Sequence, residues 1–259
     1  MKTRFYKNTA YLSDLNENEQ CDTALFFIHG AGLTKELWKK QVGAFPDQAA
    51  TIAIDLPGHG ESSGSPSKSI SEYADAVMAI VRHLAPDRAV LCGLSMGGAV
   101  CIDLLIRYPK AFAGAILMHT GARLKVSRLI FDALEKGIED YIDLMAAFAV
   151  SAKSDADKIR NSIRDCCVFS AKTAEMDFMA CDAFDRMGSL SAIQVPVLVI
   201  TGSDDLVTPG KYGTYLHENI KNSYRYVVKD AGHLSPLESP EIINEQIGLF
   251  LKKISGQAG

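Results

Sequence analysis

The sequence lacks the features that identify several classes of protein. Its 259 residues carry a net charge of −4 and contain no basic stripe, so nothing in the chain favours binding to nucleic acid or to an anionic membrane. The uncharged run of residues 89–102 is too short and too rich in glycine to cross a bilayer. The first thirty residues contain no secretion signal of the usual pattern, and we therefore expect a cytosolic protein.

Cysteine is present but lacks the spacing that metal and redox sites require. The six cysteines, at positions 21, 92, 101, 166, 167 and 181, form no Cys-x-x-Cys pair, which argues against a zinc ribbon or a thioredoxin-like site. We expect reduced thiols, with Cys92 and Cys101 as small core residues. The adjacent pair Cys166 and Cys167 has no explanation in the pattern beyond helix packing.

What the sequence does contain is an alternation of short apolar runs with helical patterns. Strands are expected at residues 23–28, 50–54, 89–92, 113–118, 195–200 and 224–228, and helices at 33–42, 71–84, 99–108 and 240–254. Because such runs are apolar on both faces, they predict an α/β fold with a parallel sheet covered by helices. Residues 3–6 and 9–12 are expected to add an antiparallel hairpin at one edge.

One region breaks this alternation. Residues 123–191 show helical patterns without a strand signal, and about 70 residues is far longer than an ordinary connection between two strands. We therefore expect this block to be an inserted helical lid, called the cap below. The remaining residues, 1–122 and 192–259, are expected to form the core.

The most informative segment is Gly-x-Ser-x-Gly at residues 93–97, between a predicted strand and a predicted helix. A strand that turns this sharply into a helix places Ser95 in a strained turn with its hydroxyl clear of the sheet. The glycines are needed because a Cβ atom at either position would collide with the neighbouring strand or helix. The free N–H groups of the new helix are then available to stabilise developing negative charge.

Four other motifs also follow predicted strands directly. They are His-Gly-Ala-Gly at 29–32, Asp-Leu-Pro-Gly-His-Gly-Glu-Ser at 55–62, Thr-Gly-Ser-Asp-Asp-Leu-Val-Thr-Pro at 201–209 and Asp-Ala-Gly-His at 230–233. Open α/β sheets carry their sites at the carboxyl edge of the strands. These motifs are therefore expected to meet near Ser95.

The five motifs in this order resemble the α/β-hydrolase family, whose triad runs serine, acid, histidine along the chain. Within that family the chain is similar to small bacterial carboxylesterases, enol-lactonases and pimeloyl-carrier-protein methyl ester esterases. The resemblance covers essentially the whole chain. It implies an α/β-hydrolase fold with a mostly parallel eight-stranded sheet, an inserted helical cap, and no metal or organic cofactor.

Carried over residue by residue, the resemblance makes Ser95 the nucleophile and His233 the base that takes its proton. The family pattern Gly-x-x-Asp-x-x-x-Pro selects Asp205 as the acid, which holds the imidazole in the right tautomer. The neighbouring Asp204 remains the alternative for that role.

The resemblance also assigns the oxyanion hole to the backbone N–H groups of Ala31 and Met96. Leu94, directly before the nucleophile, stands where carbon–carbon bond hydrolases of the family often have a polar residue. This departure favours an ester, a thioester or a lactone as substrate, and we expect Leu94 to line the substrate pocket.

Other candidate substrate-binding residues are His119, which follows a strand near the site, and the cap residues Met145 and Phe148. Apolar and adaptable side chains suit a ceiling over an acyl group. His29 and His59 belong to loop motifs and are expected to hold those loops by hydrogen bonds.

The sequence therefore predicts a serine hydrolase that acts on a small-molecule acyl ester. A perhydrolase, an acyltransferase, a lyase or a carbon–carbon bond hydrolase remains open on the same triad, and so does a non-catalytic small-molecule receptor with this fold. Cap cations leave an acidic partner open, such as an acyl carrier protein: Lys125, Arg128, Lys158, Arg160 and Arg164. The sequence gives no indication of the oligomeric state.

Overall fold

The computed structural model describes residues 1–15, 22–168 and 170–256, and its centre is one eight-stranded sheet of order β1-β2-β4-β3-β5-β6-β7-β8. Its strands are β1 (Lys2–Tyr6), β2 (Thr9–Ser13), β3 (Thr23–Ile28), β4 (Ala50–Ile54), β5 (Arg88–Leu94), β6 (Gly114–Met118), β7 (Val197–Gly202) and β8 (Ser223–Val228). β1 and β2 pair antiparallel, β2 joins β4 antiparallel, and all other pairs are parallel. The predicted α/β class and the edge hairpin are confirmed.

Five of the described helices belong to the predicted core and cover the sheet: α1 (Ile70–Leu84), α2 (Met96–Arg107), α7 (Lys211–Asn219), α8 (Ser235–Glu238) and α9 (Pro240–Ser255). Neither α7 nor α8 is among the helix ranges expected from the sequence. The helix expected over residues 33–42 is wrong: only the 3-10 turn η1 (Lys35–Trp38) forms there. Its first residue is held from outside, because Asp55 accepts hydrogen bonds from both the backbone N–H and the Nζ of Lys35.

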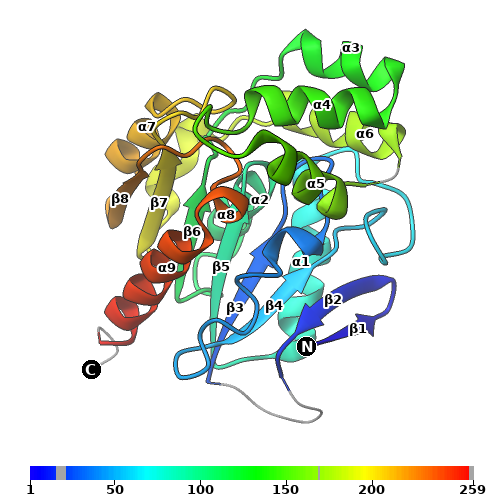
Figure 1. Cartoon of the computed structure of the whole chain (residues 1–259). Helices are drawn as coiled ribbons and strands as arrows, with labels where there is room; N and C mark the ends of the chain where they lie inside the picture. Colours follow the sequence, from blue (N-terminus) through cyan, green and yellow to red (C-terminus); the bar gives the residue numbers. More distant parts are fainter. Residues whose placement is uncertain (16–21, 169, 257–259) are drawn as a thin grey trace.

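The cap residues form α3 (Arg128–Lys136), α4 (Ile138–Phe148), α5 (Ala156–Cys166) and α6 (Ala171–Asp182), followed by the 3-10 turn η2 (Met187–Ala192). Figure 1 shows α3, α4, α5 and α6 gathered above one end of the sheet, the end at which β5 passes into α2. β1 and the end of α9 lie at the opposite end. The four helices therefore cover the sheet edge that carries the motifs.

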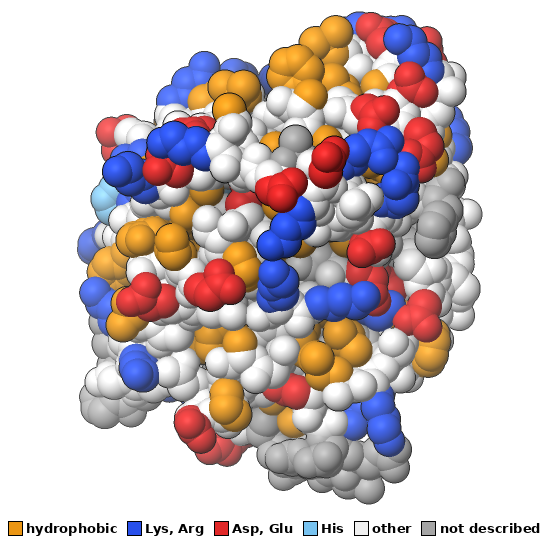
Figure 2. Space-filling view, viewed as in Figure 1, with side chains coloured by type: hydrophobic (Ala, Val, Ile, Leu, Met, Phe, Trp, Pro, Cys, Tyr) orange, Lys and Arg blue, Asp and Glu red, His pale blue; other side chains and the backbone are white. Residues whose placement is uncertain are grey.

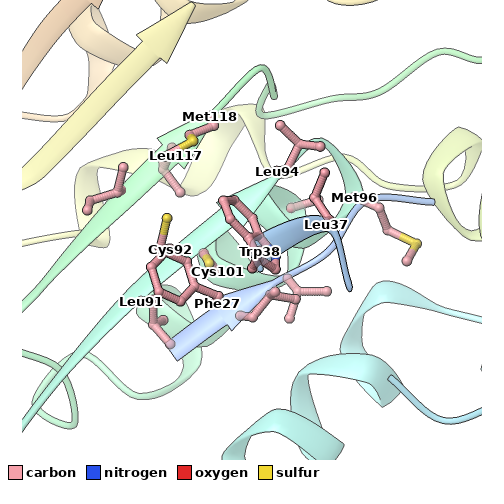
Figure 3. Packing of buried hydrophobic residues seen from close by; sticks show 14 of the residues in the cluster. Phe27, Leu37, Trp38, Leu91, Cys92, Leu94, Met96, Cys101, Leu117 and Met118 are labelled. Atoms are coloured by element: carbon pink, nitrogen blue, oxygen red, sulfur yellow. The ribbon is translucent and has the colours of Figure 1, made fainter. Parts of the chain in front are cut away.

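The core contains the only tryptophan of the chain. Trp38 is fully buried, and its ring centroid lies 4.9 Å from that of Phe27. Figure 3 shows it among Phe27, Leu37 and Leu94. Because Leu94 directly precedes Ser95 in the chain, Trp38 belongs to the part of the core that adjoins this serine.

All five described cysteines are free and buried, as expected; Cys21 lies outside the described residues. Cys166 and Cys167 do more than pack a helix. The Cys166 carbonyl accepts a hydrogen bond from the Thr34 N–H at 2.8 Å, and Cys167 forms an antiparallel bridge with Leu33. The chain leaving α5 thus pairs like a short strand with the loop after β3.

No helix among the described residues is both long enough and apolar enough to span a membrane.

Candidate active site

Ser95 lies at the turn between β5 and α2 with a φ angle of +54°, a strained conformation for a residue with a side chain. The flanking glycines are needed for contact reasons. A Cβ on Gly93 would lie 2.2 Å from the Gly97 carbonyl oxygen, and a Cβ on Gly97 would lie 2.2 Å from the Ile28 carbonyl oxygen of β3. The turn can therefore form only because both positions lack side chains.

The loops after β7 and β8 bring Asp205 and His233 together. Asp205 Oδ2 lies 3.0 Å from His233 Nδ1, and both side chains are buried. The alternative acid, Asp204, lies elsewhere: its carboxylate accepts hydrogen bonds from Ser151 at 2.5 Å and from Ser203 at 2.7 Å. The structure thus places Asp205, and not Asp204, against the histidine.

Asp205 is stabilised as a carboxylate by several donors. Its Oδ1 accepts the N–H groups of Val207 (2.9 Å) and Thr208 (2.8 Å), and its Oδ2 accepts the Thr208 hydroxyl at 2.8 Å. Burial opposes the charge, but His233 and the hydrogen bonds from both His233 and His119 outweigh it. They hold the pKa of Asp205 well below its ordinary value.

His119 lies behind the acid and not in the pocket where we expected it. Its Nδ1 donates to Asp205 Oδ2 at 2.9 Å, and its Nε2 lies 2.6 Å from the Ser235 hydroxyl on α8. Burial lowers the pKa of His119, so the ring is neutral and accepts the Ser235 proton. Both ring nitrogens are therefore engaged, and no ring atom is left for a substrate.

Two cavities meet at Ser95. A small one of about 20 Å³ is lined by Ala31, Leu94, Ser95, Met145 and His233 together with Gly30, Leu33, Ile130, Phe178, Val207 and Leu234. A larger one of about 250 Å³ extends from Ser95 under the cap, and Met145 and Phe148 line it. Within the described residues no hydrogen bond joins Ser95 to His233, so the two side chains share a cavity without being paired.

The expected oxyanion donors lie on either side of Ser95. A Cβ on Gly30 would touch the Ser95 Cβ at 3.5 Å, which places the loop of residues 29–32 directly against the serine. Met96 is the first residue of α2, and the first N–H groups of a helix have no partner within it. Both amides are thus close to the serine.

His29 and His59 fix their loops, as the sequence led us to expect. His29 Nδ1 donates to the Gly30 carbonyl at 2.9 Å, and His29 Nε2 accepts the Leu56 N–H at 3.1 Å. Burial lowers the pKa of His29 to about 3. His59 contacts Asp177 of the cap at 2.7 Å, a partner that no sequence motif indicated.

Among the described residues, His119, Asp205 and His233 are the one group whose ligand atoms lie close enough to hold a metal ion, all within 4.8 Å of one another. The Nδ1 atoms of both histidines donate to the same Asp205 oxygen. A metal ligand needs an unprotonated nitrogen, so these contacts suit a hydrogen-bond network and not a metal site.

Comparison with known proteins identifies relatives across nearly the full length. The model of a family described as the alpha/beta hydrolase family matches residues 25–246. Over 243 residues the chain is 29% identical to 3-oxoadipate enol-lactonase 2 of Acinetobacter baylyi, covering 90% of each chain. It is 28% identical to the pimeloyl-[acyl-carrier protein] methyl ester esterase of Neisseria meningitidis, covering 84% of this chain and 89% of that one.

Solved structures agree. A thermophilic esterase is 32% identical with a TM-score of 0.81, over 98% of this chain and 97% of that one. The enol-lactonase of Burkholderia xenovorans has the same fold, with a TM-score of 0.87 at 24% identity, over 97% of this chain and all of the other.

Proposed function

This chain belongs to the alpha/beta hydrolase family and is an enzyme, and from that premise we propose that it cleaves a small-molecule carboxylic ester, thioester or lactone through an acyl-enzyme on Ser95. The observation that carries the proposal is that His233, whose Nδ1 lies 3.0 Å from Asp205 Oδ2, lines the same cavity as Ser95.

In the first half of the reaction, His233 Nε2 takes the proton of the Ser95 hydroxyl while Ser95 Oγ attacks the acyl carbon. The carbonyl oxygen becomes negative, and the N–H groups of Ala31 and Met96 bind it. When the intermediate collapses, the bond to the leaving oxygen or sulfur breaks, and the leaving group takes the proton from His233. Ser95 is then acylated.

In the second half, water replaces the leaving group. His233 takes a proton from water, the hydroxide attacks the acyl carbon, and the proton returns to Ser95 Oγ as the acid departs. Asp205 stabilises the imidazolium in both halves without itself accepting the proton. No cofactor enters this sequence of steps.

The pocket supports an uncharged acyl group. Of the residues that line the larger cavity, Lys125 alone is charged, and its Nζ already donates to the Asp182 carbonyl at 2.9 Å. The other lining side chains are mainly apolar, among them Leu144, Met145 and Phe148. An acyl chain without a carboxylate therefore matches the lining better than one that carries a charge.

The cap cations favour a free small molecule over a carrier-bound substrate. Four of these five cations, all except Lys158, have ion-pair partners among the described residues: Lys125 pairs with Asp182, Arg128 with Asp132 and Glu135, Arg160 with Glu139 and Asp143, and Arg164 with Glu139. On the face drawn in Figure 2, basic and acidic side chains alternate without a broad basic region. An acidic partner would have to compete with these internal carboxylates. In this proposal residues 123–191 serve as the cap that selects the acyl group.

The direct test is to trap the acyl-enzyme. The protein is mixed with short-chain p-nitrophenyl esters, quenched in acid, and analysed by peptide mass spectrometry, with fluorophosphonate labelling in parallel. We expect turnover, the acyl mass on the peptide that contains Ser95, and labelling of the same residue. Turnover without modification of Ser95 in either experiment would exclude this mechanism.

A further inference from the structure

Three cap residues hold the loop that carries Ala31. Asp177 on α6 accepts the Gly32 N–H at 2.8 Å, and the Tyr141 hydroxyl on α4 donates to the Ala31 carbonyl at 3.3 Å. The Gly32 carbonyl accepts the Val168 N–H at 3.0 Å. The peptide unit between Ala31 and Gly32 is thus held at its carbonyl by one cap helix and at its N–H by another.

The preceding peptide unit, which contains the Ala31 N–H, is held by the core. Its carbonyl, that of Gly30, accepts hydrogen bonds from His29 Nδ1 at 2.9 Å and from the Leu33 N–H at 3.2 Å. The direction of the Ala31 N–H therefore depends on two anchors, one in the core and one in the cap. An oxyanion donor must be aimed before the charge develops, so this orientation bears on the rate of reaction.

Asp177 is itself fixed by charge. It is fully buried; His59 Nε2 donates to its Oδ2 at 2.7 Å, and the Tyr73 hydroxyl donates to its Oδ1. The other nitrogen of His59 donates to the Pro57 carbonyl at 3.0 Å. Because neither acceptor carries a proton, His59 is an imidazolium. Burial alone lowers the pKa of His59, but Asp177 outweighs burial and raises it.

The cap approaches the loop so closely that only glycine fits. Gly32 has a φ angle of +69°, and a Cβ there would lie 2.9 Å from the Tyr141 hydroxyl oxygen and 3.3 Å from the Ala174 Cβ. A buried carboxylate that pairs with a buried cation resists displacement, since separating them leaves an uncompensated charge. The contact between cap and loop is therefore both tight and rigid.

We propose that Asp177, together with Tyr141, is a positioning residue for the oxyanion hole, so that the cap acts on the chemical step as well as on the choice of substrate. Asp177 lines neither cavity at Ser95 and acts through the Gly32 N–H. The inference rests on the proposed function, because it requires Ala31 to bind the oxyanion.

The test compares Asp177→Asn with Glu175→Gln, a matched change at a half-buried carboxylate on the same helix, where Glu175 pairs with Lys172. For a p-nitrophenyl ester, Asp177→Asn should lower kcat roughly 10- to 100-fold, somewhat less than complete loss of one oxyanion donor costs. KM should stay within about twofold. Glu175→Gln should match the parent protein in both parameters.

A second readout separates positioning from loss of cap packing. Ser95 adds to the carbonyl of an alkyl trifluoromethyl ketone and forms an oxyanion, whereas the matching alkyl methyl ketone binds without forming an adduct or a charge. In Asp177→Asn the affinity for the trifluoromethyl ketone should fall in proportion to kcat/KM, and the affinity for the methyl ketone should not change. Equal losses for both ligands, or a folded variant with kcat within twofold of the parent, would overturn the proposal.

If Asp177→Asn does not fold, Tyr141→Phe makes the smaller change, because it removes one hydrogen bond to the Ala31 carbonyl. It should lower kcat and the affinity for the trifluoromethyl ketone together, roughly 3- to 10-fold; no change in either would refute the inference. The parent protein is assayed first. If it neither turns over esters nor labels at Ser95, the proposed function itself has failed, and with it the premise of this inference.

Discussion

Two buried histidine–carboxylate pairs flank Ser95, and they differ in what the second ring nitrogen faces. In the pair formed by Asp205 and His233, Nδ1 contacts the carboxylate and the ring lines the cavity. In the pair formed by Asp177 and His59, Nε2 contacts the carboxylate while Nδ1 is taken by a backbone carbonyl. In the proposed mechanism the first ring exchanges a proton with the substrate. The second is stabilised in its charged form by Asp177 and holds a loop in place.

The comparison shows that residue type does not distinguish a proton carrier from an anchor. Each pair joins an aspartate to an imidazole. Two features decide the role of each imidazole: whether the ring lines the cavity, and which group its second nitrogen contacts. His119 is a third example. Its Nδ1 also contacts Asp205, but its Nε2 contacts the buried Ser235 hydroxyl and not the cavity.

The largest effect should come from removing the hydroxyl of Ser95. Ser95→Ala should lower kcat by roughly 10⁴ or more, as loss of the nucleophile does in other serine hydrolases. The fold should be unchanged, because the substitution is small and the flanking glycines remain. Far-UV circular dichroism and steady-state ester hydrolysis measure the two quantities. A purified variant with more than a few per cent of the parent activity would contradict the assignment of Ser95.

The next largest effect should come from disrupting the pair of Asp205 and His233 alone. Asp205→Asn should lower kcat by roughly 10³ to 10⁴, because an amide favours the wrong tautomer of His233. Asp204→Asn is the matched control at the neighbouring position and should lower kcat by no more than a few-fold, since that carboxylate contacts Ser151 and Ser203. If the two variants rank in the opposite order, Asp204 is the acid.

Substitutions at two cap residues should have a smaller effect, which changes the choice of substrate without changing the reactivity of Ser95. Met145→Ala and Phe148→Ala enlarge the cavity that extends from Ser95. They should change the ratio of kcat/KM between acetyl and octanoyl esters by roughly 3- to 30-fold, since each methylene in a pocket contributes about 1 kcal/mol or more. Fluorophosphonate labelling of Ser95 should proceed as in the parent. An unchanged chain-length profile across both variants would place specificity in the core loops.

The smallest effect concerns stability and should distinguish the two loop histidines. The pKa of His29 is lowered to about 3 in the folded chain. As pH falls below 6.5, the unfolded chain therefore binds a proton at this residue and the folded chain does not, so the protein loses stability. The pKa of His59 is raised by Asp177 and Asp55 against burial, so its contribution is present below pH 6.5 and is lost as pH rises through the higher folded value.

Thermal unfolding between pH 4.5 and 8.5 tests these signs. Relative to the parent, His29→Gln should flatten the acid side of the profile and His59→Gln the alkaline side, each by a few degrees in Tm. The exposed His217, changed to Gln, is the control and should leave both sides as they are. A flattening on the same side for both variants would show that the assigned protonation states are wrong.

The sequence predicted those candidate site residues that lie in recognisable motifs. Ser95, Asp205 and His233 each follow a strand of a parallel sheet, and the carboxyl ends of such strands meet at one edge, so their proximity could be foreseen. The α/β class followed from strands that are apolar on both faces. These predictions needed only local pattern and one rule of topology.

Contacts between helix faces could not be predicted in the same way. Asp177 lies in a helix whose sequence does not reveal which face turns to the core, and its partners are 104 to 145 residues away. His119 was recognised as near the site, but its role depends on Ser235, which is supplied by the one-turn helix α8. Residues 33–42 form only the 3-10 turn η1, and the contact of its first residue with Asp55, 20 residues away, could not be read from the local pattern.

The short strand-like pairing of Cys166 and Cys167 with the loop after β3 bears on engineering. A cap that touched the core only through apolar side chains could be exchanged between relatives as a module. This cap instead forms backbone hydrogen bonds with the loop beside Ser95. A chimera that exchanges the cap must therefore carry the matching loop, residues 29–34, with it.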